Sequence, residues 1–147
     1  MRHITQEGLD LIKHFEGFSP IVYTCPAGYA TIGYGHLMTK DETFKTIKQD
    51  DAQELLRNDA EDAERAVLRY IDVPLTDGQF DALVSFTFNL GSGALQRSTL
   101  RRKVNRQAHG EVPDQFNRWV WAGGRKLNGL IARRRMESEL YLSLIHI

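Results

Sequence analysis

One segment in the middle of the chain is apolar on nearly every side of a predicted helix. The Gly91-Ser92-Gly93 segment ends it, and its larger apolar residues are Phe80, Leu83, Val84, Phe86, Phe88 and Leu90. The preceding Thr76 and Gln79 have the spacing of a capping box, which marks a helix start. A helix that is hydrophobic all round is stable only when other elements bury it. The sequence therefore predicts one buried central helix, and 147 residues suffice for one domain with a sizeable core.

Smaller elements are expected before this helix. Thr5 is placed to cap a first helix that ends near Phe15, before Glu16 and Gly17. Strand-prone residues at 22–24 and 30–32 flank a Pro-Ala-Gly turn, which predicts a β-hairpin. A second capping box, Thr39 to Glu42, predicts a helix that starts near Lys40. Helical periodicity then predicts one long amphipathic helix over 51–70.

Short helices are expected after the central helix. One is predicted from about Ser98, and another from Pro113 that carries Phe116, Trp119 and Val120 and ends at the glycine pair 123–124. Asn128 is placed to cap a last helix. The predicted fold class is therefore α+β: a small N-terminal hairpin lobe, a long connecting helix and a larger all-helical lobe. The lobes are too small to be separate domains, and the cleft between them is the expected binding site.

The charges are divided unevenly along the chain, although the formal net charge is zero. Residues 41–64 hold nine acids and three bases, and residues 95–147 hold eleven bases and four acids. A basic half favours an anionic partner such as nucleic acid, anionic lipid or a charged glycan. A solvated helical face explains the same pattern equally well, so charge alone leaves the partner open.

Several features exclude other classes of protein. Cys25 is the only cysteine, which excludes an intrachain disulfide and a cysteine-based zinc site, and we expect neither metal nor cofactor. No apolar run is long enough for a transmembrane helix, and the N-terminus lacks the apolar core of a signal peptide. We therefore expect a protein that starts in the cytoplasm, without stable membrane insertion. We also expect it to be a monomer.

The segment from Glu16 to His36 concentrates the candidate chemistry. Glu16 follows an amphipathic helix, and the glycine-rich hairpin after it carries Cys25 and Thr31 in the pattern E-x8-C-x5-T-I-G-Y-G-H. Phe15 can shield the Glu16 carboxyl from water, and this carboxyl lies at the negative end of the helix dipole. Both conditions favour its protonated form, which can donate a proton. A general acid for sugar-chain hydrolysis needs such a carboxyl. Each of these residues also has a purely structural interpretation, above all His36, since most lone histidines make structural hydrogen bonds.

Three blocks together resemble one known family. The block at 16–36 resembles the active-site signature of phage-type lysozymes, the endolysins of glycoside hydrolase family 24. The segments FTFNLGSGAL (86–95) and WAGGRKLNGLIARRRMESELYL (121–142) resemble the same family, in the same order. Family members cut the β-1,4 bond between N-acetylmuramic acid and N-acetylglucosamine in peptidoglycan. The resemblance therefore implies a lysozyme-like fold over residues 1–142 and a bacteriolytic hydrolase that binds glycan strands.

The resemblance also implies roles for individual residues. Glu16 is the implied general acid, Cys25 takes the position usually held by aspartate, and Thr31 positions the water. The implied substrate-binding residues are His36, Asn89 and Gly91, and one arginine of 133–135 is expected to orient the acid. The family usually relies on a holin-type membrane lesion. The expected location is therefore the host cytoplasm until the membrane is permeabilised, and then the periplasm and cell wall.

Two alternatives to a hydrolytic muramidase remain open. No Asp or Glu lies between Gly17 and Lys40, so the hairpin offers no second carboxylate. This favours a lytic transglycosylase on the same bond, which needs one acid and no water, whereas Thr31 argues against it. A non-catalytic binder of nucleic acid or glycan would explain the arginine clusters. It leaves the hairpin block unexplained, and the chain has no recognisable nucleic-acid-binding motif.

The end of the chain receives a separate interpretation. The hexapeptide from Leu142 to Ile147 resembles the translation of a transposon end used in preparing sequencing libraries. On that interpretation residues 143–147 are a non-native tail, and a natural apolar C-terminus is the alternative. We therefore leave the tail out of the fold prediction.

Overall fold

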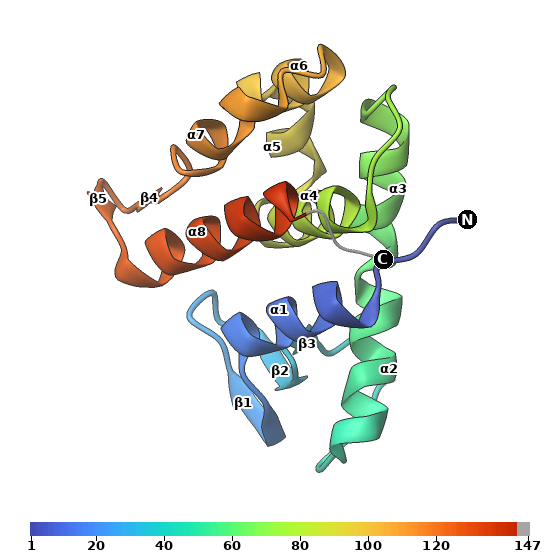
Figure 1. Ribbon diagram of the computed structural model, residues 1–147. Helices are drawn as coiled ribbons and strands as arrows, with labels where there is room; N and C mark the ends of the chain where they lie inside the picture. The colour runs from blue at the N-terminus through green and yellow to red at the C-terminus, as the bar shows by residue number, and fades with distance from the viewer. Residues whose placement is uncertain (144–147) are drawn as a thin grey trace.

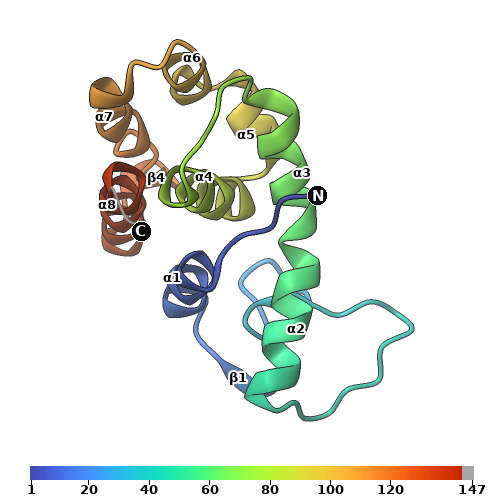
Figure 2. The same ribbon diagram turned by 45° about the vertical axis from the view of Figure 1, so that its right-hand side comes forward.

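The computed structural model describes residues 1–143, and its two lobes are joined by a pair of consecutive helices (Figures 1 and 2). The small lobe contains a three-stranded antiparallel sheet in the order β1-β2-β3. Its strands are β1 (Ser19–Thr24), β2 (Ala30–Gly33) and β3 (His36–Leu37). The expected hairpin is thus present, with a short third strand beside β2. The larger lobe is mainly helical, so the α+β, lysozyme-like fold class is confirmed.

The connection between the lobes differs from the single helix expected. Helix α2 (Gln49–Asp59) and helix α3 (Glu61–Tyr70) are separated at Ala60. Ala60 keeps helical angles, and its N–H still donates to the carbonyl of Leu56 at 2.9 Å. The prediction of one uninterrupted helix was therefore wrong only at this junction. The apolar periodicity continues across Ala60, so the sequence pattern does not reveal the break.

Helix α4 (Asp77–Leu90) forms the centre of the core, as expected. The capping box is complete: the Thr76 hydroxyl accepts from the Gln79 N–H at 3.1 Å, and the Gln79 side chain accepts from the Thr76 N–H at 2.9 Å. Helix α4 packs against α1 (Gln6–Glu16), α3 and α8 (Asn128–Leu142). Helix α1 ends and helix α8 begins on the same side of the molecule (Figure 1). Side chains from these two helices, which are far apart in sequence, can therefore contact each other there.

The rest of the larger lobe consists of short elements. They are α5 (Ser92–Arg97), α6 (Thr99–Asn105), a 3-10 turn (His109–Glu111), α7 (Val112–Phe116), β4 (Trp121–Ala122) and β5 (Arg125–Lys126). Helix α6 begins near the predicted position, and Ser98 caps it by accepting from the Arg101 N–H at 3.0 Å. No helix in residues 1–143 is long and apolar enough to cross a bilayer.

Four local predictions were wrong for identifiable reasons. No helix starts at Lys40, because Glu42 folds back to the Thr39 N–H and to His36 and the segment remains a turn. Thr5 precedes α1 but donates its hydroxyl hydrogen bond to Asp81 instead of capping the helix. Asn128 is the first residue of α8 and not its cap.

The fourth error concerns the segment after Pro113. Helix α7 ends at Phe116, so Trp119 and Val120 lie beyond it. Gly123 and Gly124 both have positive φ, 59° and 81°, and form the turn of the β4–β5 hairpin where a helix end was expected. The prediction of a non-native tail falls mostly on residues 144–147, which lie outside the described residues.

Candidate active site

Glu16 is the last residue of α1, and its carboxylate is held from the larger lobe. The next residue, Gly17, has a positive φ of 71° and ends the helix. Glu16 Oε2 accepts a hydrogen bond from Arg133 Nη1 at 3.0 Å, and the Glu16 side chain is 24% exposed. The acid predicted from the sequence is therefore partly accessible and fixed by an ion pair.

Arg133 is the arginine of the three that reaches the acid, and other groups lock it in place. Its Nε lies 3.3 Å from Glu137 Oε2, and its Nη2 donates to the backbone carbonyl of Ser85 at 3.2 Å. The Ser85 hydroxyl in turn donates to Glu137 Oε2 at 2.6 Å. Arg133, Glu137 and Ser85 are all buried, so the guanidinium presents a fixed Nη1 toward Glu16.

The other two candidate arginines have different positions. Arg134 is fully buried, pairs with Glu137 at 3.2 Å and donates to the side chain of Asn89. Burial lowers the pKa of Arg134 to about 10, against the opposing effect of Glu137, so the side chain stays charged at neutral pH. Arg135 is exposed.

Gly35 brings the backbone of the small lobe against the same carboxylate. A Cβ at this position would lie 2.7 Å from Glu16 Oε1, and Gly35 has a φ of 77°. Any other residue would clash with the acid and would also adopt an unfavourable backbone conformation. Arg133 therefore holds one oxygen of Glu16, and the absence of a side chain at Gly35 leaves room for the other.

Cys25 and Thr31 are brought together by the β1–β2 hairpin. Hydrogen bonds from the backbone of Tyr29, and with smaller effect from Ala27, Gly28 and the Thr31 side chain, lower the pKa of the Cys25 thiol, while desolvation opposes them. Thr31 is buried, at 2% exposed, and its hydroxyl donates a hydrogen bond to the carbonyl of Tyr29 at 2.9 Å. A thiol with increased thiolate character and a hydroxyl thus share one end of the hairpin.

His36 lies between two carboxylates. Its Nδ1 is 2.8 Å from Asp59 Oδ2 on α2, and its Nε2 is 2.9 Å from Glu42 Oε1. Burial acts to lower the pKa of His36, but the hydrogen bonds and charges of Asp59 and Glu42 together raise it. Both ring nitrogens are thus occupied within the protein. This geometry indicates that His36 attaches the 38–47 loop to α2. The expected contact of His36 with substrate stays a prediction.

Asn89 and Gly91 lie at the end of α4. Gly91 has a φ of 95° and ends the helix. It borders a cavity of about 310 Å³ that is also lined by Asp59, Asp62, Ala63, Thr87, Phe88 and Ser92. Asn89 is bound by Arg134 instead. One predicted substrate residue therefore faces a cavity, and the other is attached to the buried arginine.

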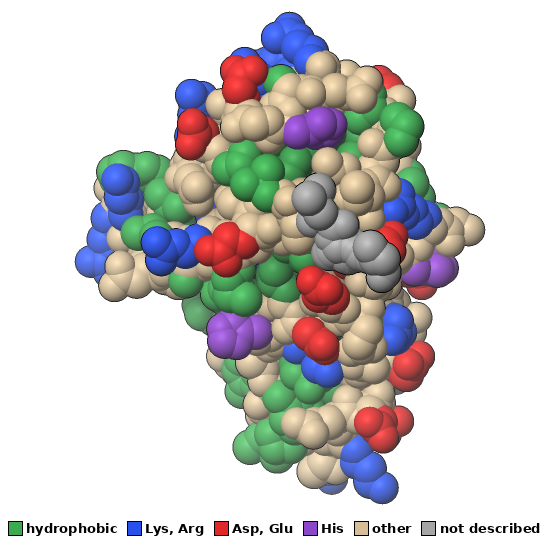
Figure 3. Space-filling view, viewed as in Figure 1, with side chains coloured by type: hydrophobic (Ala, Val, Ile, Leu, Met, Phe, Trp, Pro, Cys, Tyr) green, Lys and Arg blue, Asp and Glu red, His purple; other side chains and the backbone are tan. Residues whose placement is uncertain are grey.

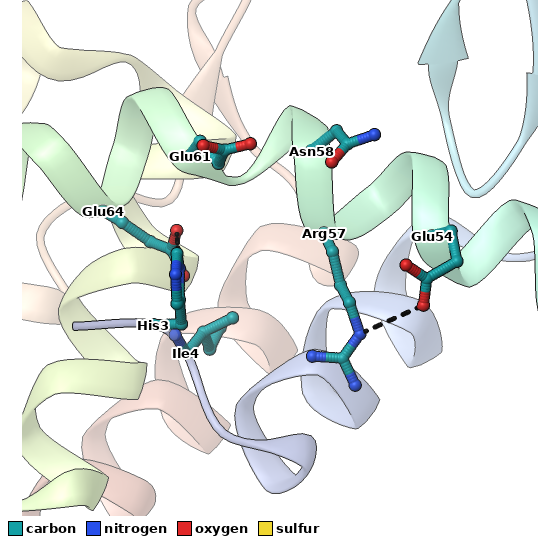
Figure 4. A pocket seen from close by; sticks show the side chains of 7 residues that line it. All are labelled: His3, Ile4, Glu54, Arg57, Asn58, Glu61 and Glu64. Carbon is teal, nitrogen blue, oxygen red and sulfur yellow. Dashed lines mark hydrogen bonds and ion pairs between the residues drawn. The ribbon is translucent and has the colours of Figure 1, made fainter. Parts of the chain in front are cut away.

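A second cavity, of about 370 Å³, lies at the junction of α2 and α3 (Figure 4). It contains none of the predicted site residues. Its buried carboxylate, Glu64, accepts from the Ile4 N–H at 2.6 Å and lies 3.0 Å from His3 Nδ1. These contacts attach the N-terminal segment to α3, so this cavity has a structural explanation. In the described residues no cluster of three or more His, Cys, Asp or Glu side chains could hold a metal ion.

Sequence reasoning missed the partners of the candidate residues. Glu137 stands four residues after Arg133 on one helix, a spacing that suggests an ion pair. Ser85 is a polar residue inside an apolar helix, which also could have marked it. No local signal marked Glu42 and Asp59 as partners of His36, because their contacts with it depend on how the loop and α2 pack.

Known proteins share this fold. The muramidase domain of SpmX from Asticaccaulis excentricus superimposes with a TM-score of 0.87 and 37% identity, covering 97% of this chain and 99% of that one. An endolysin of Acyrthosiphon pisum secondary endosymbiont phage 1 is 38% identical over 145 residues, covering 96% of this chain and 99% of the relative. The fold and site thus define a lysozyme-like protein.

The family itself follows from the sequence match. The phage lysozyme family matches residues 13–137, and the chain belongs to that family. The enzyme class expected from the sequence, a lysozyme-type peptidoglycan hydrolase, is the class of this family. An endolysin of Bacillus phage B103 is also 38% identical over 143 residues, 96% of this chain, but the chain spans about half of that relative's length, 54%.

Proposed function

We propose that this protein is an endolysin muramidase that hydrolyses the β-1,4 bond between N-acetylmuramic acid and N-acetylglucosamine, with Glu16 as the general acid. The observation that carries the proposal is the hydrogen bond from Arg133 that fixes the Glu16 carboxylate beside Gly35, in a member of the phage lysozyme family. A general acid must lie within hydrogen-bond reach of the leaving oxygen, so a fixed, partly exposed carboxyl suits the role.

The proposed reaction uses one acid and one water. Glu16 donates its proton to the glycosidic oxygen while the bond from that oxygen to the anomeric carbon breaks. Water attacks the anomeric carbon and gives its proton to a base, for which Cys25 is the candidate because hydrogen bonds lower the pKa of its thiol. The lone pairs of the Thr31 hydroxyl can accept a hydrogen bond from that water.

The proposed setting follows from the substrate. Peptidoglycan glycan strands are the partner, the protein acts as a monomer, and nucleic acid and membrane are not partners. The protein stays in the host cytoplasm until the membrane is permeabilised and then acts on the cell wall, as the name endolysin implies for its relatives. His36, Asn89 and Gly91 are the proposed residues beside the bound glycan.

A turbidity assay tests the role of Glu16. Chloroform-permeabilised Gram-negative cells are treated with wild type, with Glu16→Gln and with Glu7→Gln, which alters an exposed glutamate of the same helix. We expect the Glu16 variant to lose about 10²–10⁴-fold in rate, the usual contribution of a general acid. The Glu7 variant should stay within twofold of wild type. A Glu16→Gln enzyme within a few-fold of wild type refutes the assignment.

Product analysis separates hydrolysis from the alternative. A muramidase adds one water and leaves reducing ends, whereas a lytic transglycosylase adds none and leaves 1,6-anhydro ends. We expect reducing ends in the mass spectra of digested peptidoglycan. Anhydro products from wild type would replace the hydrolytic proposal with transglycosylation by the same acid.

A further inference from the structure

The β4–β5 hairpin presents an aromatic ring and two cations to solvent. Trp121 pairs directly with Lys126, and Ala122 pairs with Arg125, across the two-glycine turn. Directly opposed residues of an antiparallel pair point to the same face. Lys126 Nζ accordingly lies 5.5 Å from the centre of the Trp121 ring. The hairpin thus fixes an indole and an ammonium side by side.

This surface is exposed. Every residue from Trp121 to Lys126 is exposed to solvent, and Trp121 is 60% exposed. Figure 3 shows hydrophobic and basic side chains gathered on the projection that carries β4 and β5 in Figure 1. Single exposed apolar residues are common, but a large ring held beside cations on paired strands has the composition of a contact surface.

The cations of the hairpin have no acidic partner. Within residues 1–143, neither Arg125 nor Lys126 forms an ion pair with a carboxylate, and the same holds for Arg118, which precedes the hairpin in sequence. In contrast, Arg133 and Arg134 in the same lobe are buried and paired with Glu137. The charge of the hairpin is therefore available to an anionic partner.

The hairpin also precedes the helix whose arginine binds the candidate acid. Only Leu127 separates β5 from α8, and Arg133, which binds Glu16, lies five residues after the start of that helix. At the rise of an α-helix this is about 8 Å along the axis. In Figure 1 the hairpin lies at the end of α8 where that helix begins, and α1 also ends on that side of the molecule. A polymer bound at Glu16 could therefore extend onto the hairpin.

On the basis of the proposed function, we propose that the β4–β5 hairpin is an additional peptidoglycan-binding surface beside the active site. The face of the Trp121 ring packs against the apolar face of a sugar, and Arg125 and Lys126 bind free carboxylates of the stem peptides. Charge complementarity selects this occupant: peptidoglycan combines sugar rings with carboxylates, and the hairpin offers a ring with cations.

Binding to purified sacculi tests the proposal without cleavage. All proteins carry Glu16→Gln, and their binding is measured by co-sedimentation at two salt concentrations. Trp121→Ala and the double change Arg125→Gln with Lys126→Gln are compared with Arg102→Gln with Arg106→Gln. The last pair removes the same charge from two exposed arginines, Arg102 on α6 and Arg106 directly after it, and α7 separates both from the hairpin in sequence. Circular dichroism confirms folding of each variant.

We expect each hairpin variant to bind about three- to tenfold more weakly, a range typical of exposed stacking and cation contacts, and the α6 control to bind like the parent. After the carboxylates of the sacculi are amidated, the parent and the Arg125/Lys126 variant should bind equally. Hairpin variants that bind like the parent, while wild type still clears cells, overturn the hairpin proposal alone. A wild type that neither binds nor cleaves peptidoglycan overturns the proposed function as well.

Discussion

Arg133 Nη1 lies 3.0 Å from Glu16 Oε2 and so joins the last helix to the end of the first, 117 residues apart in sequence. The guanidinium does not hold the acid alone. It is 4% exposed and is held by Glu137, which is fully buried. The position of the candidate acid therefore depends on a carboxylate that does not touch it.

Replacing Glu137 should damage both stability and activity. Glu137→Gln removes the buried negative charge that faces Arg133 and Arg134, and breaking a buried pair in this way costs about 3–5 kcal/mol. Urea unfolding measures the loss. Lysis rates should fall as well, because Arg133 is no longer fixed. Glu139→Gln, on the exposed side of the same helix, is the control and should change neither quantity. An equally stable Glu137→Gln protein would show that the ion pairs are not needed.

The sequence could predict this site only in part. Glu16, Cys25 and Thr31 lie in one short block whose spacing is visible in the sequence, and the Thr76 capping box and the apolar α4 depend on local patterns. The β4–β5 hairpin was missed because the glycine pair 123–124 is compatible with a helix end and equally with a two-residue hairpin turn, in which both residues have positive φ. Glu42 was assigned to a helix start because its bond to His36 depends on the packed loop.

His36 should make stability depend on pH. Its pKa is raised in the folded state, so the charged imidazole stabilises the fold fully below its ordinary pKa of 6.5, and this contribution is lost as pH rises through the folded value. The pKa of Glu42 is lowered, chiefly by the Thr39 N–H and then by His36, so its contribution is present above 4.5 and is lost as pH falls. Burial raises the pKa of Asp59 and acts in the opposite direction.

Thermal unfolding checks this pH dependence. The melting temperature should be highest between about pH 5 and 6.5 and should fall by a few degrees by pH 8.5. In His36→Gln the fall above pH 6.5 should disappear. His14→Gln alters an exposed histidine and should keep the wild-type profile. If His36→Gln retains the same fall, another group is responsible.

Gly35→Ala should impair catalysis by displacing the acid. The added Cβ would lie 2.7 Å from Glu16 Oε1. An alanine at a φ of 77° also costs about 1–2 kcal/mol in backbone strain. We expect lower stability and a reduced rate. In a Glu16→Ala background the clash is removed, so the same substitution should cost only the backbone strain. An equal loss of stability in both backgrounds would contradict contact between Gly35 and the acid.

Substitutions at Cys25 should decide whether the thiol takes part in catalysis. Cys25→Asp supplies a carboxylate at the position where the family usually has one and should remain active, with a rate that no longer rises toward alkaline pH. Cys25→Ser keeps the size but forms no anion at usable pH, and Cys25→Ala removes both properties. Because hydrogen bonds from Tyr29 and its neighbours lower the pKa of the thiol, the wild-type rate should rise with pH through a value below that of an ordinary cysteine.

The same series distinguishes a base from a residue that only lines the site. If the thiolate accepts a proton or stabilises positive charge, the Ser and Ala variants should be about equally slow and should lack the alkaline rise. Iodoacetamide should then react with Cys25, which is partly exposed, and inactivate the enzyme, and glycan fragments should protect it. A fully active Cys25→Ala enzyme with an unchanged pH profile would remove Cys25 from the mechanism.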